Sequence, residues 1–444
     1  MELQHINTDG QERELPTDLG QTMHDFMADM FPFCRSITGN GVRETLAYIG
    51  NKIPLDIHEV RSGTQVFDWT VPLEWNIADA FIKDPSGKRL IDFQQCNLHV
   101  VNYSVPIHKK MTLVDLKPHL HSLPDHPAWI PYRTSYYREN WGFCLSHKQL
   151  SELPEGVELE VCIESTLSPG SLTYGECYLP GHNSEEILIS CHICHPSLCN
   201  DNLSGIAVAT FLAQWLSAQS RRYSYRILFV PATIGAIAWL AMNRGLVTRI
   251  KHGFVLTGVG DAGAFTYKKS RNGTAEVDRA FGHVLRHKGQ GHRVIDFNPY
   301  GYDERQYCSP GFNLPVGCLM RTPHGQYAEY HTSADNLDFV KPESLADTIS
   351  LCKEAIEVLE QNGTYIGTNP YCEVQLGRRG LYRTVGGQSG EHRSELALLW
   401  ILNLSDGQHS LLDIAERSGY SFKVIREETA ILLQHGLLRE SSVA

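Results

Sequence analysis

The stretch SCHICHPSLCNDNLSG, residues 190–205, places three cysteines, two histidines and one aspartate within sixteen positions. It begins at the end of the apolar run EILIS and leads into the helical pattern GIAVATFLAQWLSAQ. Open α/β sheets bind their ligands in loops of this kind, at the carboxyl ends of strands. The stretch therefore predicts an α/β sheet with a polar site at its edge.

The α/β pattern extends from residue 185 to about 365. Apolar runs such as RILFVP and HGFVLTG alternate there with helical patterns, which is typical of a mainly parallel sheet flanked by helices. The run at 227–242 is too short to cross a membrane and contains Pro231 and Gly235, so it predicts a buried strand followed by a helix. Helical spacing over 19–50 predicts two further helices of the same domain.

Two regions have a different pattern. Residues 60–178 consist of short alternating stretches separated by turn signals, which predicts a β-rich inserted module that roofs the site. The last 70 residues predict three helices and a terminal strand, the order of a winged helix-turn-helix. We therefore expect an α/β domain at 1–59 and 179–370, the inserted domain at 60–178 and the winged helix at 375–444.

Charge and composition narrow the class of partner. The 444 residues carry a formal net charge of −11, which argues against a nucleic-acid surface over the whole molecule. In the expected recognition helix, Lys423 and Arg426 lie beside Glu427 and Glu428, which would repel phosphates. We expect a small-molecule or peptide substrate, no nucleic acid, and a winged helix that docks protein or forms a homo-oligomer. The basic stretch 377–383 is the one patch that argues otherwise.

The amino-terminal sequence and the cysteines bear on location. MELQHINTDGQERELPTD is polar and acidic and lacks the pattern of a secretory signal. Twelve cysteines in so long a chain favour reduced thiols over a disulfide framework. We expect a cytoplasmic protein that does not enter the membrane.

Histidine and aspartate at strand ends suggest a metal site. His192 ends the strand that begins the stretch, and Asp201 lies just before the next helix. Imidazole and carboxylate are the ligands of catalytic zinc, although a polar loop with a buried histidine stays open as the alternative. Asp261 follows a later strand in HGFVLTGVGDAG, and His331 lies in YAEYHTSADNLD after another expected strand.

The order of these residues resembles that of the co-catalytic zinc aminopeptidases, which have a phosphorylase/hydrolase-like α/β fold with a mixed sheet flanked by helices. The resemblance implies that His192 and Asp261 bind one zinc, that His331 binds the other, and that Asp201 bridges the two. It covers the first helices and residues 180–365.

A second resemblance spans nearly the whole chain. The stretches CHICHPSLCNDNLSG, PATIGAIAWL, DERQYCSPGFNLPVG and EYHTSADNLDF are similar to those of an aminopeptidase-like family of unknown function that also has the β-rich insertion and the winged helix. Genes of this family are often found beside polysaccharide or natural-product biosynthesis genes. The resemblance therefore implies a role in such a biosynthetic gene cluster.

The departures from the zinc aminopeptidases concern the chemistry directly. Their Glu-Glu pair, which supplies a general base and a metal ligand, is replaced by Ala232-Thr233. Their aspartate two residues after the first histidine is Cys194. We therefore expect one zinc per chain, held by His192, Asp201 and Asp261, with His331 close by.

Two glutamates are candidates for the missing catalytic base. Glu329 lies two residues before His331 and would share its face if both lay on a strand; otherwise it is a solvated glutamate. Glu304 lies in an expected loop, where pairing with Arg305 is the alternative. A structural zinc, iron–sulfur or thiol redox site at Cys191, Cys194 and Cys199 lacks a partner cysteine pair, and His195 is either a supporting residue or a loop filler.

Two functional hypotheses follow. The first is a metal-dependent aminopeptidase-like hydrolase that cleaves an amide bond of a small peptide-like or aminoacylated substrate. The second is a catalytically silent protein that keeps the fold and pocket for binding. The missing Glu-Glu pair supports the second hypothesis, and the retained ligand-type residues support the first.

Overall fold

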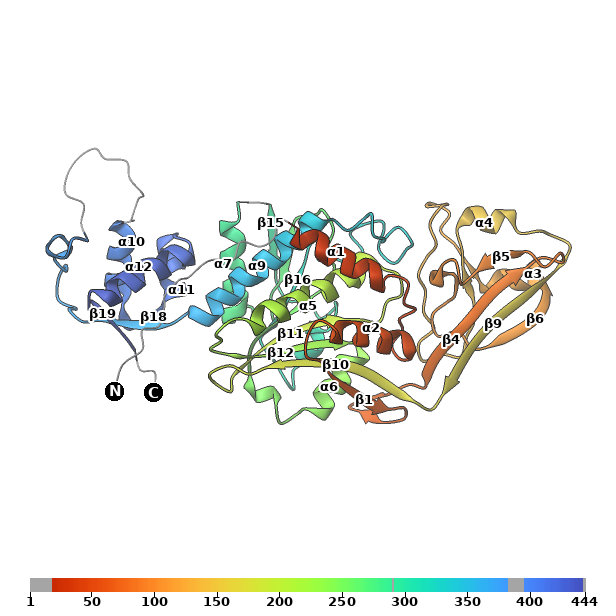
Figure 1. Ribbon diagram of the computed structural model, residues 1–444, viewed down its shortest axis with the longest axis horizontal. Coiled ribbons are helices and arrows are strands. Elements are labelled where there is room, and N and C mark those ends of the chain that lie inside the picture. Colours follow the sequence, from red (N-terminus) through yellow and green to blue (C-terminus); the bar gives the residue numbers. More distant parts are fainter. Residues whose placement is uncertain (1–17, 290, 382–394, 442–444) are drawn as a thin grey trace.

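The computed structural model describes residues 18–289, 291–381 and 395–441. Three parts follow one another along the long axis of the molecule (Figure 1). The α/β domain lies in the middle, the insertion at one end and the winged helix at the other. The expectations for residues 1–17 of the amino-terminal segment and for residues 382–383 of the basic stretch lie outside the described residues.

A mixed eight-stranded sheet forms the centre of the α/β domain, in the order β1-β10-β12-β11-β13-β16-β14-β15. Strands β11, β12, β13 and β16 run parallel, whereas β1, β10 and the β14–β16 pair include antiparallel neighbours. Their bounds are β1 Asp56–Arg61, β10 Ser171–Leu179, β11 Glu186–His192, β12 Ser224–Val230, β13 Ile250–Leu256, β14 Phe265–Lys268, β15 His292–Ile295 and β16 Val316–Met320.

Helices cover both faces of this sheet. Strand β11 is buried on both sides: Ile187 and Ile189 pack into the larger core, and Leu188 packs into the other. Helices contributing to the larger core are α1 Leu19–Met30, α2 Asn40–Gly50, α5 Ser204–Ser217, α7 Glu276–His287 and α9 Pro342–Gln361; those on the other face are α6 Ile234–Met242 and α8 Glu304–Tyr307. The predicted helices of 19–50 and the strand-to-helix reading of 227–242 are confirmed.

The insertion is a separate β-rich body joined to the main sheet by long strands. Its four-stranded sheet has the order β5-β4-β9-β6. Because β1 and β10 belong to the main sheet, the insertion spans about 62–170 and not 60–178. Its elements are β2 Gln65–Val66, β3 Trp69–Thr70, β4 Glu74–Lys83, β5 Arg89–Asp92, β6 Ile107–Thr112, α3 Leu113–Leu116, β7 Leu120–His121, β8 Phe143–Cys144, α4 His147–Glu152 and β9 Glu158–Ser168.

The winged helix begins earlier than residue 375, because β17 (Thr364–Gly367) is the central strand of its sheet, in the order β18-β17-β19. Its other elements are α10 Glu395–Leu404, β18 Asp406–Ser410, α11 Leu411–Ser418, α12 Phe422–Gln434 and β19 Leu438–Glu440. It packs on α7, where the Arg279 guanidinium pairs with Asp413 and Glu416, each at 2.6 Å.

Membrane insertion through a helix has no support in the described part of the chain. None of its helices combines the length and the apolar character that a membrane crossing requires.

Candidate functional site

The opening stretch folds as a strand, a loop and a kinked turn that leads into α5. His192 is the last residue of β11, and Asp201 lies in the turn Cys199–Leu203, where its own φ and ψ are non-helical. Both side chains are completely buried. Gly205 follows at the start of α5, where a Cβ atom would lie 2.4 Å from Asn202 Oδ1, so a larger residue would displace the turn.

Hydrogen bonds from three directions fix the turn that carries Asp201. The amides of Asn200 and Asp201 donate to the two carboxylate oxygens of Asp335, at 2.6 and 3.0 Å. Asn202 Nδ2 donates to the carbonyls of His192 and Leu256. Burial raises the pKa of Asp335 to about 8, and the neighbouring charge of Asp201 acts in the same direction. Asp201 is therefore held rigidly beside the end of β11.

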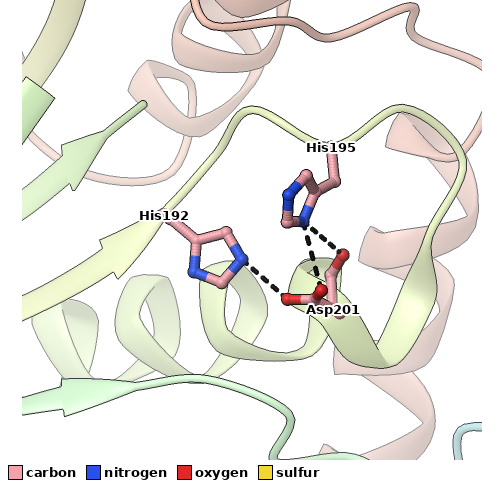
Figure 2. Close-up of side chains that lie close together, drawn as sticks. All are labelled: His192, His195 and Asp201. Carbon is pink, nitrogen blue, oxygen red and sulfur yellow. Dashed lines mark hydrogen bonds and ion pairs between the residues drawn. The ribbon is translucent and has the colours of Figure 1, made fainter. Parts of the chain in front are cut away.

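Three imidazoles converge on the Asp201 carboxylate. His192 Nε2 lies 2.8 Å from Oδ1, His331 Nε2 lies 3.0 Å from Oδ2, and His195 Nδ1 lies 3.4 Å from Oδ2. Figure 2 shows His192 and His195 approaching the carboxylate from two sides. Burial alone would raise the pKa of Asp201, but the adjacent His195 and His192 hold it well below its ordinary value. The carboxylate is therefore ionised and available as a ligand.

His195 is held in place by the loop between the first two helices. Its backbone carbonyl accepts a hydrogen bond of 2.8 Å from Arg35 Nε, and Arg35 Nη1 donates to the carbonyl of Met30 at the end of α1. Arg35 is completely buried, and burial lowers its pKa to about 10. The first two helices therefore position the site.

His331 lies in a turn that the insertion holds. Its φ is +56°, and its carbonyl accepts a 2.8 Å hydrogen bond from the Tyr132 amide. Ser333 exchanges two further hydrogen bonds with Ile130. The Tyr132 ring stands edge-on to His195 and His331, with ring centroids 5.3 and 5.2 Å apart. Residues 130–132 of the insertion thus form one wall of the site.

Other tyrosines stack on the imidazoles. Tyr302 lies nearly parallel to His192 at a centroid distance of 5.0 Å, and Tyr330 lies nearly parallel to His331 at 3.9 Å. Burial raises the pKa of Tyr302 and that of Tyr330 well above the ordinary value of a phenol, so both side chains are neutral.

Asp261 does not join this cluster. Its Oδ1 accepts hydrogen bonds from Thr322 Oγ1 and the Gly263 amide, and its Oδ2 accepts from Asn200 Nδ2 and the Thr322 amide. All four contacts lie between 2.6 and 3.2 Å. Asp261 therefore supports the turn at Asn200, and it is not a member of the group formed by His192, His195 and Asp201.

The two glutamates considered as catalytic bases lie in different surroundings. Glu304 is completely buried and forms an ion pair of 2.5 Å with Lys268 of β14. Its partner is therefore this lysine and not Arg305, which the sequence suggested as the alternative. Glu329 is partly buried in a run of turns, which corrects the expectation that it shares a strand face with His331. Residues 327–331, Tyr-Ala-Glu-Tyr-His, show the alternation that is typical of a strand although they form turns.

The segment where zinc aminopeptidases carry Glu-Glu also lies near the cluster. The Ala232 carbonyl is 3.8 Å from Cys194 Sγ, in the loop between His192 and His195. Neither Ala232 nor Thr233 offers a carboxylate, so this wall supplies no acidic ligand.

Asp303 is a buried carboxylate that the sequence did not single out. Its side chain is completely buried, and neither oxygen has a hydrogen-bond partner within the described structure. Burial, reinforced by Glu304, raises its pKa to about 8. It influences Cys191 and Cys194 electrostatically, which places it behind the end of β11. The only feature of the sequence that could have indicated this carboxylate is the acidic dipeptide Asp303-Glu304.

The donor set suits a single transition-metal ion. Ligand atoms of His192, His195 and Asp201 all lie within 4.8 Å of one another, the one such group of three found among the described residues. His331 reaches the same carboxylate from the remaining side. Three imidazoles and one carboxylate fit zinc in number and kind. The nearby cysteines are free thiols outside this group. His195 belongs to the group, whereas the sequence left open whether it supports the site or only fills the loop.

Comparisons with known proteins agree with this architecture. The profile of a family described as a domain of unknown function (DUF4910) matches residues 24–362, and a winged helix-turn-helix profile matches residues 363–440. The chain is 52% identical over 423 residues to a Clostridium acetobutylicum protein provisionally named as a polysaccharide biosynthesis protein with an aminopeptidase-like domain. The match covers 95% of this chain and 97% of the relative.

Solved structures show the same fold. A Clostridium acetobutylicum crystal structure, provisionally titled a peptidase, superposes with a TM-score of 0.91 at 50% identity, covering 95% of this chain and 97% of that one. A zinc aminopeptidase from Bacillus subtilis superposes with a TM-score of 0.56 at 10% identity, covering 78% of this chain and 96% of that one. The aminopeptidase-like fold expected from the sequence is confirmed.

Proposed function

The chain belongs to the DUF4910 family, and from that premise we propose that it is a metal-dependent hydrolase of aminopeptidase-like fold. Its reaction is the cleavage of an amide bond in a small peptide-like or aminoacylated substrate. The observation that carries this proposal is the convergence of three imidazoles on one buried, ionised carboxylate.

In this proposal one zinc ion is held by Asp201, His192, His195 and His331. The donor set differs from the one expected from the sequence, because His195 takes the place that Asp261 was given. Two metals would need a second carboxylate near Asp201, and Ala232-Thr233 removes it. A structural role for the cluster is less favoured, because a completely buried, ionised Asp201 carboxylate is costly unless a cation or proton balances its charge.

A bound divalent metal supplies polarisation of a carbonyl oxygen and activation of water. The protein groups supply orientation. Asp335 and Asn202 hold Asp201 and the end of β11, Arg35 holds the loop of His195, and Tyr132 holds the turn of His331. The His331 side chain is 33% exposed whereas His192 is fully buried, so substrate approaches from the His331 side.

Glu329 is the better placed of the two candidate proton acceptors. It lies two residues before His331, whose side chain is partly exposed, and it is itself only partly buried. Glu304, by contrast, is sealed in its ion pair with Lys268. A carboxylate that accepts a proton from water must reach the solvent-accessible part of the site.

Metal analysis of protein purified without chelators tests the proposal. We expect close to one zinc per chain in the wild type and at least a tenfold loss of zinc affinity in Asp201→Ala and His331→Ala. His108→Ala, which alters an exposed imidazole of the insertion sheet, is the matched control and should keep its zinc. Wild-type protein that takes up no divalent metal would contradict the proposal.

A second candidate function, binding without catalysis, is favoured by the absence of the Glu-Glu carboxylates. Hydrolysis of a panel of aminoacyl-p-nitroanilides by the zinc-loaded protein separates the two. Turnover that disappears in Glu329→Gln while zinc content is kept supports the hydrolase. Zinc binding without turnover of any substrate supports the binding protein.

The cellular setting is part of the same proposal. The provisional name of the Clostridium acetobutylicum relative supports a place in polysaccharide biosynthesis. All twelve cysteines are free, which supports a reducing compartment such as the cytoplasm. We place the chain there, acting on a small substrate, with the winged helix as a protein-docking or homo-oligomer module that does not bind nucleic acid.

A further inference from the structure

A small pocket opens where Ala232-Thr233 replaces the larger acidic pair. Its volume is about 140 Å³, and its floor is formed by the two small residues and the start of α6. Trp69, Tyr136, Tyr137 and Ile237 line it as well. The substitution that removes acidic groups therefore coincides with space for a ligand group.

A larger groove of about 690 Å³ lies next to the pocket, because Trp69 and Ile237 line both. This groove runs between the β2–β3 hairpin of the insertion and α6. It reaches Phe67, Arg244 and Phe312 at its far end. The volume of the groove is large enough for a ligand of more than one ring.

The small pocket begins next to the proposed metal site. Tyr136, which lines it, shares a 2.9 Å hydrogen bond between phenol oxygens with Tyr132. Tyr132 in turn packs against His195 and His331. One pair of tyrosines therefore lies between the pocket and the imidazole cluster.

Aromatic faces and hydrogen-bonding groups alternate along the groove. The side chains of Trp69, Tyr137 and Phe67 are 46%, 49% and 38% exposed, which is unusual for such large apolar groups. Asp68, Gln306 and Arg244 lie beside these rings. Arg244 stacks over Phe67 at 4.6 Å, and no carboxylate of the described chain pairs with its guanidinium.

We propose that this groove binds a sugar moiety of the substrate, with pyranose rings against Trp69 and Tyr137 and hydroxyl groups bonded to Asp68, Gln306 and Arg244. A pyranose has an apolar face of C–H groups, which packs on an aromatic ring, and a rim of hydroxyls that needs donors and acceptors. An alkyl chain would leave three polar groups of the groove without partners, which disfavours it. That the sugar belongs to the hydrolysed substrate rests on the proposed function.

Binding of disaccharides tests the groove directly. The probes are N,N′-diacetylchitobiose, cellobiose, maltose and lactose, measured by saturation-transfer NMR against the full-length protein. We expect a transfer signal from at least one of them, reduced at least fivefold in Trp69→Ala and in Asp68→Asn. Tyr371→Ala, which removes an 83% exposed ring outside the groove, is the matched control and should keep the signal.

Three outcomes overturn the inference: no signal from any disaccharide, a signal that persists in both groove variants, or full displacement of the sugar by N-hexanoylglycine. Circular dichroism shows whether the variants fold, and Asp68→Asn keeps the test decisive if Trp69→Ala does not. The measurement is repeated on His331→Ala. His331→Ala should lose zinc, so sugar binding that persists in this variant shows that the groove binds sugar independently of the metal site. A failure of the hydrolase proposal can then be distinguished from a failure of the sugar site.

Discussion

Asp303 is the residue whose surroundings have the clearest consequence for stability. Its carboxyl group is fully buried without a hydrogen-bond partner in the described structure, and its pKa is raised to about 8 by burial and by Glu304. An unfolded aspartate has its ordinary pKa near 3.8. The folded state therefore retains a proton that the unfolded state loses, and stability falls as pH rises from about 4 to 8.

We expect Asp303→Asn to remove this dependence. At pH 5 the wild-type side chain is protonated, and the amide should match it closely. At pH 9 the variant should be more stable by about 3 to 5 kcal/mol, because the wild type then buries an unpaired charge. Thermal unfolding followed by circular dichroism at both pH values measures the difference. Asp125→Asn, at an exposed position, is the control, and a stability gain of equal size at both pH values would contradict the argument.

The residues of the site differ in how well the sequence predicts them. His192, Asp201 and His331 were named from their positions near strand ends, and the structure brings them together. Asp261 was named on the same grounds, but the amides of Gly263 and Thr322 and the side chain of Asn200 occupy its oxygens. Residue type and spacing identify a carboxylate near an edge, whereas its orientation depends on contacts distant in sequence.

Secondary structure elements were predictable where an apolar run is bounded by polar or turn residues. Strand β11 and helix α5 show continuous apolar patterns, and both appear where expected. The run of turns that carries His331 was not predictable, because Ser333 and the His331 carbonyl bond to Ile130 and Tyr132 of the insertion. Long-range backbone pairing of this kind leaves no local periodic signal.

The contact between α7 and α11 yields a prediction at this scale. Arg279 bonds to both Asp413 and Glu416, and all three side chains are about 70% buried. We expect Arg279→Ala to destabilise the protein by about 1 kcal/mol, since a partly exposed charge pair contributes modestly. Arg286→Ala is the control, because that side chain is 54% exposed and its contact with Glu416 is longer, 3.3 Å. Urea denaturation measures both, and equal losses would contradict the assignment.

At the scale of the whole molecule, the winged helix packs against the α/β domain. Its helix α12 holds the position of the second helix of a helix-turn-helix, and it contributes Arg426 and Thr429 to a cavity of about 740 Å³. Arg222 and Glu276 of the α/β domain line the same cavity. One face of α12 is therefore engaged within the chain itself.

We accordingly expect no binding of duplex DNA at physiological salt. The overall charge of −11 and the acidic neighbours on α12 act in the same direction as its placement. Fluorescence anisotropy of a labelled 30-base-pair duplex, titrated with protein at 150 mM salt, checks this. Micromolar affinity that weakens steeply with added salt would show that the winged helix reads nucleic acid after all, and Arg426→Ala would then test whether α12 is responsible.

The distance along the chain between Asp201 and His331 also determines how long after Asp201 the ribosome adds His331. The two residues are 130 positions apart. At about 5 to 20 residues per second, a ribosome needs between about 7 and 26 seconds to travel from one to the other. During that interval the nascent chain already contains His192, His195 and Asp201 but lacks the third imidazole. Any ion captured early meets an unfinished set of ligands, and the newborn protein acquires its final selectivity only when the last turn emerges and docks on the insertion.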